Sequence, residues 1–482
     1  MQLAVKNNKW LLPATIALLF FSIAYTVLSG NLLIMAAPFI VAYLFLVVVN
    51  WKNAYWLLLF CIPPSIQFTL FNNALSLSLP DEPICWLFLL LLILLVAYRP
   101  IIIPRWLLQQ PITFIVILQL LWLVVAVLFS KVLILSIKFF IAKIWYLACF
   151  FILPVLVFKD KKDLKIGFLL ILLPMLVTMM VIFVRHAALH FSFANIGAAI
   201  GMLYVNHVEY ASVISMFFPV VCIAYPLTKN SKTWIRVSLL IIILFFVVSI
   251  FLTYARAALL ALIFATIVGY AIKKRLVNFI MPAIYAVIVL TGVYLGQDKR
   301  YIDLRPDFEH TYMHSNYSSH LIATIQGRDL SSMERLYRWV AAIRMSADEP
   351  FTGYGPHGFY YHYKSYALPL FRTYVSKNEE HSTTHNYFLY MLTEQGWPAM
   401  ILYAILIIVV FAQAQKIYHR FNDLFYQYVT LGLAMAFAVC FVNNFFSELI
   451  ETHKVGALFY LILALLVVLD KKSRDIKGTP AV

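Results

Sequence analysis

Positively charged and histidine side chains gather in one polar segment, residues 297–385, of an otherwise apolar chain. Within this polar segment, Arg335 and Arg338 are three positions apart in a helical pattern, next to Trp339. Side chains three or four positions apart share a helix face, so both guanidiniums can bind the oxygens of one diphosphate. The simpler alternative is a solvated helix face on which Glu334 pairs with them.

Arg256 is a third cation of interest because it stands at the mouth of two predicted spans, in Leu252-Thr-Tyr-Ala-Arg-Ala-Ala. A cation at membrane depth is costly and tends to have a function, whereas one at the interface extends cheaply to water. Basic anchors in this chain concentrate on the other side of the membrane, which favours a function for Arg256.

His385 stands where the apolar pattern resumes, followed by Asn386. A histidine in that position is partly desolvated and can accept a proton near neutral pH. Glu394 follows inside the next span, where an acid either serves a function or pairs with a basic residue to hold helices together. Lys143, near the outer end of another span, either binds substrate or extends to the interface.

The other histidines of the polar segment lack metal-ligand spacing, so we expect no metal and no cofactor. They are His310, His314, His320, His357, His362 and His381.

The composition places these residues in a membrane protein. Of 482 residues, 63% are hydrophobic and 12% charged, and the mean hydropathy is +0.88. A soluble protein of that composition would expose far too much apolar surface, so we expect an all-α polytopic membrane protein. The net charge of +16 does not indicate nucleic-acid binding, because the basic residues form short clusters between apolar runs. The five cysteines lie in or near these runs and suggest no disulfide framework.

Apolar runs of spanning length predict about fourteen transmembrane helices, within a range of 12–14. They are Trp10–Leu28, Leu32–Val49, Ala54–Phe71, Pro83–Ala97, Ile112–Phe129, Phe139–Phe158, Leu164–Val184, Val208–Leu227, Trp234–Leu252, Ala257–Ile272, Val277–Leu295, Asn386–Ala412, Leu424–Phe445 and Val455–Leu469. The predicted domains are a helix bundle at 1–296, the polar segment at 297–385, and the last helices with a tail at 386–482.

The distribution of lysine and arginine predicts the orientation of these spans. With the N-terminus inside, the inside loops hold most of the basic residues, while the short outside loops hold only Lys131, Lys138, Arg185, Arg256 and Lys454. Both termini are then cytoplasmic and the polar segment lies outside. Within it, Ser331–Ala347 predicts a helix with Leu336, Val340 and Ile343 on its apolar face and Ser331 as its cap.

Four motifs in order resemble the bacterial O-antigen ligase and O-antigen polymerase superfamily. They are Tyr254-Ala-Arg-Ala-Ala-Leu, Arg335-Leu-Tyr-Arg-Trp, Glu349-Pro-Phe-Thr-Gly-Tyr-Gly-Pro-His-Gly-Phe and His385-Asn-Tyr-Phe-Leu-Tyr-Met-Leu-Thr-Glu-Gln-Gly. Motifs of this superfamily follow one another across a large periplasmic loop. Ala255 departs from the pattern, since the family often has serine there, so this chain lacks a hydroxyl beside Arg256.

The resemblance implies a metal-independent glycosyltransferase of the bacterial inner membrane, with a periplasmic loop and a role in lipopolysaccharide biosynthesis. Its donor would be a glycan linked to undecaprenyl diphosphate, and its acceptor lipid A–core for a ligase or a second lipid-linked glycan for a polymerase. We assign catalysis to Arg256 and Arg335, which would stabilise the departing diphosphate, and to His385 as base. We assign substrate binding to Arg338, Glu394, Asn386, Lys143 and Tyr254.

Two other functions compete with this assignment. A flippase for lipid-linked oligosaccharides would share the span count and the diphosphate-binding cations, but would carry charges deep in many spans. A peptidoglycan-type polymerase also uses a lipid diphosphate donor, and no feature of the sequence favours it. Between ligase and polymerase the sequence favours the ligase, because the loop motifs match the ligase-related domain most directly.

Overall fold

The computed structural model describes residues 21, 37–70, 75–306, 311, 329–373, 375–376 and 383–478. Twelve helices in these ranges are long and apolar enough to cross a membrane. The chain is therefore a helical, multi-pass membrane protein, as predicted. Apart from Phe21, the predicted first span Trp10–Leu28 lies outside the described residues.

The long helices include one span made of three pieces, because a π-helical stretch, Leu147–Ile152, joins α6 to α7. The helices of the spans are α2 (Ala37–Cys61), α3 (Asp81–Tyr98), α5 (Pro111–Leu128), α6 (Leu133–Tyr146), α7 (Leu153–Val157), α8 (Lys161–Ala188), α10 (His207–Leu227), α11 (Thr233–Leu252), α12 (Arg256–Lys273), α13 (Val277–Gly296), α17 (Tyr387–Arg420), α18 (Leu424–Phe445) and α19 (His453–Gly478). Helices outside the spans are α4 (Arg105–Leu108), α9 (Ile196–Ile200), α15 (Leu330–Asp348) and α16 (Phe359–Tyr366). Short 3-10 helices cover Pro100–Ile102, Phe193–Asn195, Gly201–Leu203, Gln297–Leu304, Pro369–Phe371 and Leu449–Glu451.

The predicted span Ala54–Phe71 is wrong in its second half, and the described part of Leu32–Val49 belongs to the same element, α2. A kink at Asn50, where φ is −151°, separates the two helical pieces of α2. This helix ends at Cys61, just before Pro63 and Pro64, because proline lacks the N–H that would continue the helix.

A two-stranded antiparallel hairpin follows in place of the rest of the predicted third span. Its strands are β1 (Ile66–Leu70) and β2 (Leu75–Leu79), and Ile66 pairs with Leu79. The alternation of leucine and serine from Leu75 to Leu79 has the period of two that is typical of a strand, and it is the signal that a search for long apolar runs overlooks.

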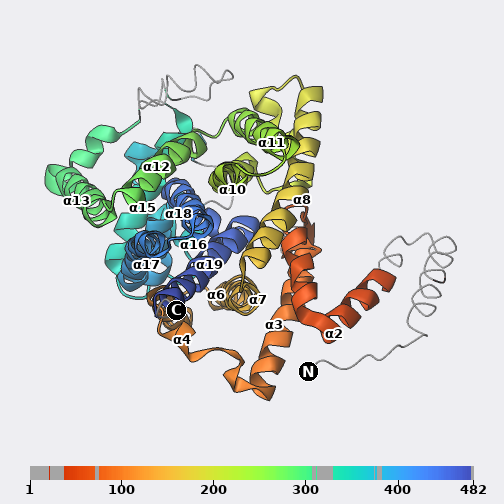
Figure 1. Ribbon diagram of the computed structural model, residues 1–482. Coiled ribbons are helices and arrows are strands. Elements are labelled where there is room, and N and C mark those ends of the chain that lie inside the picture. The colour runs from red at the N-terminus through yellow and green to blue at the C-terminus, as the bar shows by residue number, and fades with distance from the viewer. Residues whose placement is uncertain are drawn as a thin grey trace. The chain divides into compact units, whose positions relative to one another are not determined.

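The chain divides into two compact units, residues 1–65 with 160–178 and residues 66–159 with 179–482. All the candidate site residues lie in the second unit. Its centre is formed by α18 and α19, which Figure 1 shows among α6, α10, α12 and α17. The helix α18 packs against α10, α12 and α17, and α17 packs against α5. Buried side chains fill α19 along most of its length, so this helix is the axis of the unit.

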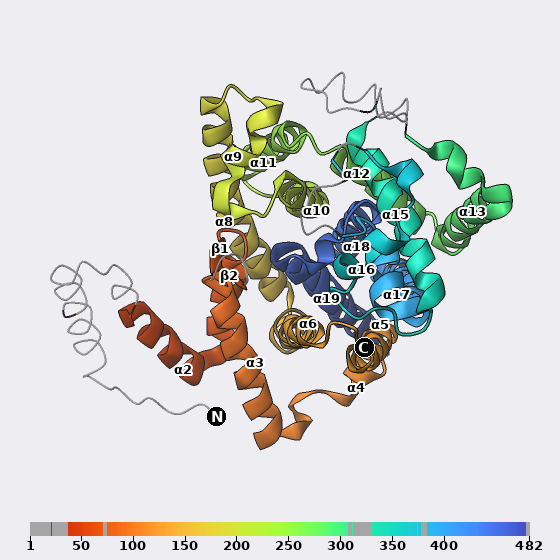
Figure 2. The ribbon, with the colours of Figure 1, turned by 180° about the vertical axis from the view of Figure 1, so that it is seen from behind.

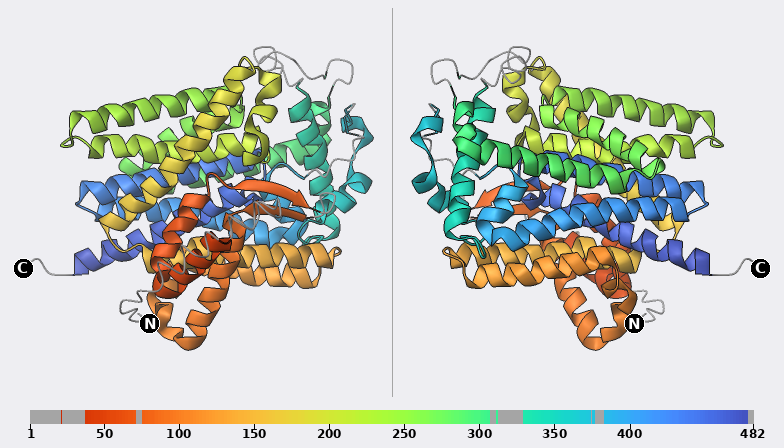
Figure 3. Two further views of the ribbon diagram at one scale, coloured as in Figure 1. Left: turned by 90° about the vertical axis from the view of Figure 1, so that its right-hand side faces the viewer. Right: turned by 90° about the vertical axis from the view of Figure 1, so that its left-hand side faces the viewer.

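The polar segment contributes α15 and α16, which both contact α17 (Figure 2). In Figure 3 the teal helix α15 runs across the ends of the long helices rather than alongside them. A small hydrophobic core of its own joins the two helices, with Tyr337, Met345, Phe359, Tyr363 and Phe371 among its buried members. The segment is therefore ordered against the ends of the spans where the structure describes it.

The predicted helix at Ser331–Ala347 exists, but its cap and its buried face differ from the prediction. The Asp329 carboxylate accepts the backbone N–H of Ser332 and caps α15. Ile343, predicted to face inward, is 57% exposed, while Tyr337 and Met345 are buried. Aromatic and methionine side chains replace the expected aliphatic stripe, because the partner of α15 is the tyrosine-rich α16.

The turn between α15 and α16 is anchored on α17 and on the start of α6. The backbone N–H groups of Tyr354 and Gly355 donate to the carbonyls of Thr393 and Glu394, at 2.9 Å each. Gly355 has a φ of +88°, and a Cβ there would lie 1.9 Å from the Ser130 hydroxyl oxygen. Gly396 bends α17 with a φ of +78°, and a Cβ there would meet the Phe351 carbonyl oxygen at 1.9 Å. Both positions therefore require glycine.

Candidate functional site

Arg256 opens the candidate site from the membrane side. It is the first residue of α12, and its Nη2 lies 3.2 Å from Oδ2 of Asp329, the fully buried carboxylate that caps α15. The ion pair therefore joins the beginnings of two helices that are far apart in the sequence. Although burial raises the pKa of Asp329, its hydrogen bond with Ser332 and the charge of Arg256 hold that pKa below its ordinary value.

Arg335 and Arg338 lie on the same stretch of α15, as the spacing predicts. Arg335 donates from Nη1 to the Ser331 hydroxyl at 2.9 Å, and Arg338 pairs with Glu334 at 3.2 Å. Of the two arginines, Glu334 pairs with Arg338, and it also accepts hydrogen bonds from the hydroxyls of Thr373 and Ser376. Burial and the charges of Arg256 and Arg338 lower the pKa of Arg335.

Three guanidinium N–H groups of this cluster are left over. In the part of the chain that the structure describes, Nη1 of Arg256, Nε of Arg335 and Nε of Arg338 are buried without a hydrogen-bond partner. A buried donor without an acceptor costs about 1–3 kcal/mol, and a charged one more. An anion with several oxygens carries acceptors for such donors, so the composition of the cluster suits a phosphate or diphosphate ligand.

His385 completes the cluster from the start of α17. Its backbone has a φ of +49°, a strained conformation for a residue other than glycine and one that concentrates at functional sites. The indole of Trp339 on α15 donates to the Thr384 carbonyl at 3.0 Å and so fixes the backbone next to His385. Burial, with the charges of Arg338 and Arg335, lowers the pKa of His385 to about 3. The imidazole is therefore neutral at neutral pH.

Two acidic residues of the site escaped the prediction from sequence. Asp329 pairs with Arg256, and Glu448, just after α18, has its Oε2 3.8 Å from Nδ1 of His385. Burial raises the pKa of Glu448, and the charge of Arg338 opposes that rise. Each acid comes from a segment distant in sequence from its partner. A carboxylate shortly before a predicted helix (Asp329) or shortly after a predicted span (Glu448) is the signal that could have identified them.

Asn386 and Tyr254 hold the backbone beside the site. Asn386 caps α17 by accepting the N–H groups of Phe388 and Leu389, and its amide donates to the Phe445 carbonyl at 3.0 Å. Tyr254 has a φ of +57° and donates its hydroxyl to the Phe191 carbonyl at 2.5 Å. These bonds position the starts of α17 and α12, while the predicted contact of both residues with substrate stays a prediction.

Glu394 faces the anchored turn instead of the arginine cluster. Its carboxylate is buried and accepts the backbone N–H groups of His357 and Phe359, at 2.7 and 3.4 Å. An acid inside a span thus obtains backbone partners from the polar segment. These contacts are of the kind that holds helices together, the alternative role considered for Glu394. Its partners are backbone N–H groups instead of a basic side chain.

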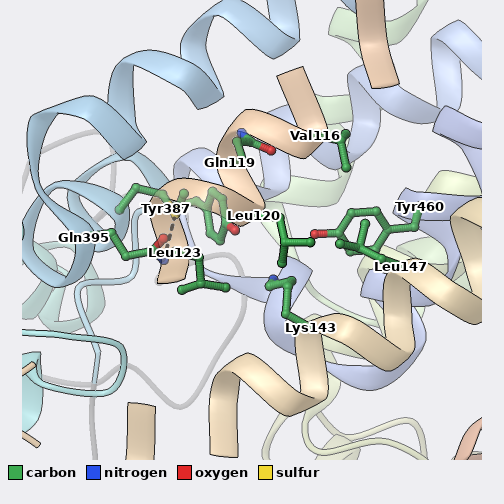
Figure 4. Close-up of a pocket in the computed structure, with 10 residues that line it drawn as sticks. Val116, Gln119, Leu120, Leu123, Lys143, Leu147, Tyr387, Gln395 and Tyr460 are labelled. Carbon is green, nitrogen blue, oxygen red and sulfur yellow. Dashed lines mark hydrogen bonds between the residues drawn. The ribbon is translucent and has the colours of Figure 1, made fainter. Parts of the chain in front are cut away.

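Lys143 is also away from the arginine cluster. Its ammonium pairs with Glu451, which lies in the turn before α19, at 2.7 Å, and it sits over the ring of Phe139. Figure 4 shows Lys143 between Leu120 and Leu123 of α5 and Tyr460 of α19, at a narrow cavity of ≈ 30 Å³. That space admits one or two water molecules. Any substrate contact of Lys143 must therefore occur elsewhere on its surface.

The fold and these contacts define a multi-pass helical membrane protein with a buried, cation-lined site at one end of its spans. Residues 239–404 match the family model described as O-antigen ligase. The matched range includes Arg256, Arg335 and His385, and the match supports the resemblance to the O-antigen ligase superfamily. At that level it supports a membrane glycosyltransferase of the ligase or polymerase type. No curated protein sequence matches the chain.

Proposed function

We propose that this protein transfers a glycan from undecaprenyl diphosphate to lipid A–core at the periplasmic face of the bacterial inner membrane. The observation that carries the proposal is the set of three unpaired guanidinium donors on Arg256, Arg335 and Arg338. The leaving group of this reaction is a diphosphate, whose oxygens suit donors fixed in advance in a site screened from water.

The reaction needs one bond broken, one bond formed and one proton moved. The bond from the sugar C1 to the diphosphate oxygen breaks, and the negative charge on the leaving diphosphate is stabilised by Arg256 and Arg335. The acceptor hydroxyl oxygen bonds to C1, and its proton passes to the neutral imidazole of His385. A pKa of about 3 makes His385 a weak base in the empty site. A bound diphosphate would offset the nearby arginine charges and raise that pKa towards neutrality.

The test is product analysis with the purified full chain in nanodiscs, a defined glycan on undecaprenyl diphosphate, and lipid A–core. We expect glycan attached to lipid A–core. Growth of the glycan on undecaprenyl diphosphate would instead identify a polymerase, and movement of the donor across the bilayer without a new glycosidic bond would identify a flippase.

The same assay tests the residues. We expect Arg256→Ala, Arg335→Ala and His385→Ala each to reduce transfer about 100-fold or more at unchanged membrane levels. Arg300→Ala is the control, because Arg300 lies 3.7 Å from Asp298 in an exposed turn and has no place in the cluster. Near-normal transfer by all three variants would contradict the assignment of the site.

A further inference from the structure

A second cavity, of ≈ 170 Å³, also has Lys143 in its wall. Its walls come from α6, from the anchored turn and from the turn between α18 and α19. The residues that matter are Lys138, Phe139, Lys143, Tyr146, His357 and Glu451. Cavities of about 150 Å³ hold a six-membered ring such as benzene, so this space suits one pyranose ring or one phosphate group.

The charges of this lysine cavity favour an anionic ligand. Lys143 and Glu451 neutralise each other at 2.7 Å, which leaves Lys138 as the uncompensated charge. Lys138 is exposed, and no ion pair to it is found among the described residues. His357 is an exposed residue, but desolvation of its ring and the two lysines lower its pKa while Glu451 opposes them, so it adds no charge at neutral pH.

The cavity also offers an aromatic surface. The rings of Phe139 and His357 meet edge to face, with centroids 5.3 Å apart. His357 is held there by its backbone bond to Glu394, in a left-handed conformation with a φ of +62°. Aromatic faces beside a cation are suited to a sugar ring that carries a negative group.

One short turn connects the lysine cavity to the arginine cluster. Glu448, at the start of this turn, faces His385 at 3.8 Å. Glu451, at its end, faces Lys143 and accepts the hydroxyl of Tyr387 at 2.6 Å. Tyr387 follows His385 by two residues. The turn from Glu448 to Glu451 and the start of α17 thus link the proposed base to a wall of the lysine cavity.

We propose that the lysine cavity is the acceptor subsite and binds an acidic sugar, one bearing a phosphate or a carboxylate, through Lys138. The assignment rests on the proposed function, because it takes the arginine cluster as the donor site. Lys138 then binds the acidic group, while Phe139 and His357 pack against the ring.

Transfer kinetics provide the first test. With the full chain in nanodiscs, we expect Lys138→Ala to raise the KM for the acceptor about tenfold and to leave the KM for the donor unchanged. Lys138→Arg should keep the KM for the acceptor close to that of the wild type. Lys364→Ala, an exposed lysine of α16 outside the cavity, is the matched control. A raised donor KM, or an unchanged acceptor KM, would overturn the assignment.

A second test needs no transfer and separates this assignment from the proposed function. Acetic anhydride should acetylate Lys138, and peptide mass spectrometry measures the rate. We expect glucose 1-phosphate or glucuronate to slow acetylation of Lys138 but not of Lys364, and glucose to have no effect. Protection by only one of the two acids would show whether the cavity binds a phosphate or a carboxylate. Equal rates with all three would overturn the acceptor subsite, whereas protection without any transfer would contradict the proposed function alone.

Discussion

At the scale of single residues, the spacing of Arg335 and Arg338 predicted a shared face, and the structure confirms it. Helical periodicity is a local property, so the sequence carries it in full. The partner of Arg256 could not be predicted in this way, because Asp329 is 73 residues away and reaches it only through tertiary packing. The same reason explains why Glu448 was missed beside His385.

The pH dependence of transfer tests His385. Its pKa of about 3 in the empty site predicts that the free enzyme keeps a neutral imidazole down to strongly acidic pH. Because kcat/KM reports groups of the free enzyme, kcat/KM for the donor should show no inflection near 6.5 and should stay level between about pH 5 and pH 8. As the pH is lowered, kcat should begin to fall at a higher pH than kcat/KM, because bound diphosphate raises the pKa of the imidazole.

Initial rates at constant ionic strength, with protein recovery checked at each pH, measure both profiles. An inflection of kcat/KM near 6.5 that His385→Gln abolishes would show an imidazole whose pKa desolvation and the flanking arginines do not lower, and would contradict the position assigned to His385.

At the scale of elements, long apolar runs predicted the helices from Asp81 onward well, since spanning helices need length and hydropathy above all. The errors lie where another rule decided the structure. Pro63 and Pro64 end α2, and the alternation of leucine and serine with a period of two favours the strands of the hairpin β1–β2. The face of α15 was misread because its packing partner, α16, was not predicted.

Glycine at position 355 tests how the anchored turn positions the site. Gly355→Ala combines a φ of +88° with a Cβ only 1.9 Å from the Ser130 hydroxyl oxygen. The backbone conformation alone should cost roughly 1–3 kcal/mol, and the turn should move away from α6. We expect a lower Tm and a strong loss of transfer.

The control for this prediction is Gly292→Ala in α13, where a Cβ would meet nothing within 4 Å. It should leave the Tm unchanged or raise it slightly, because alanine favours a helix. A Gly355→Ala protein with the Tm and activity of the wild type would show that the turn does not require this close approach.

At the scale of the whole molecule, the site is composite. It joins the start of α12, the face of α15, the start of α17 and the end of α18, and no single predicted domain contains all of these. The predicted divisions at 296 and 385 stay a prediction. The orientation also stays a prediction. The alternation of basic loops after Asp81, on which it depends, is the same whatever the number of spans before Asp81.

The orientation has a direct test at exposed positions. Ile343 on α15 and Asn230 in the turn before α11 lie in loops predicted to face opposite sides of the membrane. A membrane-impermeant maleimide should label Ile343→Cys in intact inner-membrane spheroplasts and Asn230→Cys only after permeabilisation. The reverse pattern would place the candidate site in the cytoplasm.

The central claim is that the arginine cluster binds a lipid diphosphate, and the affinity of the full chain for undecaprenyl diphosphate in nanodiscs tests it most directly. We predict that Arg256→Ala and Arg335→Ala each raise the Kd at least about tenfold. Arg344→Ala, on the exposed face of the same α15, should leave the Kd unchanged. Equal affinity in the wild type and in both cluster variants would contradict the account.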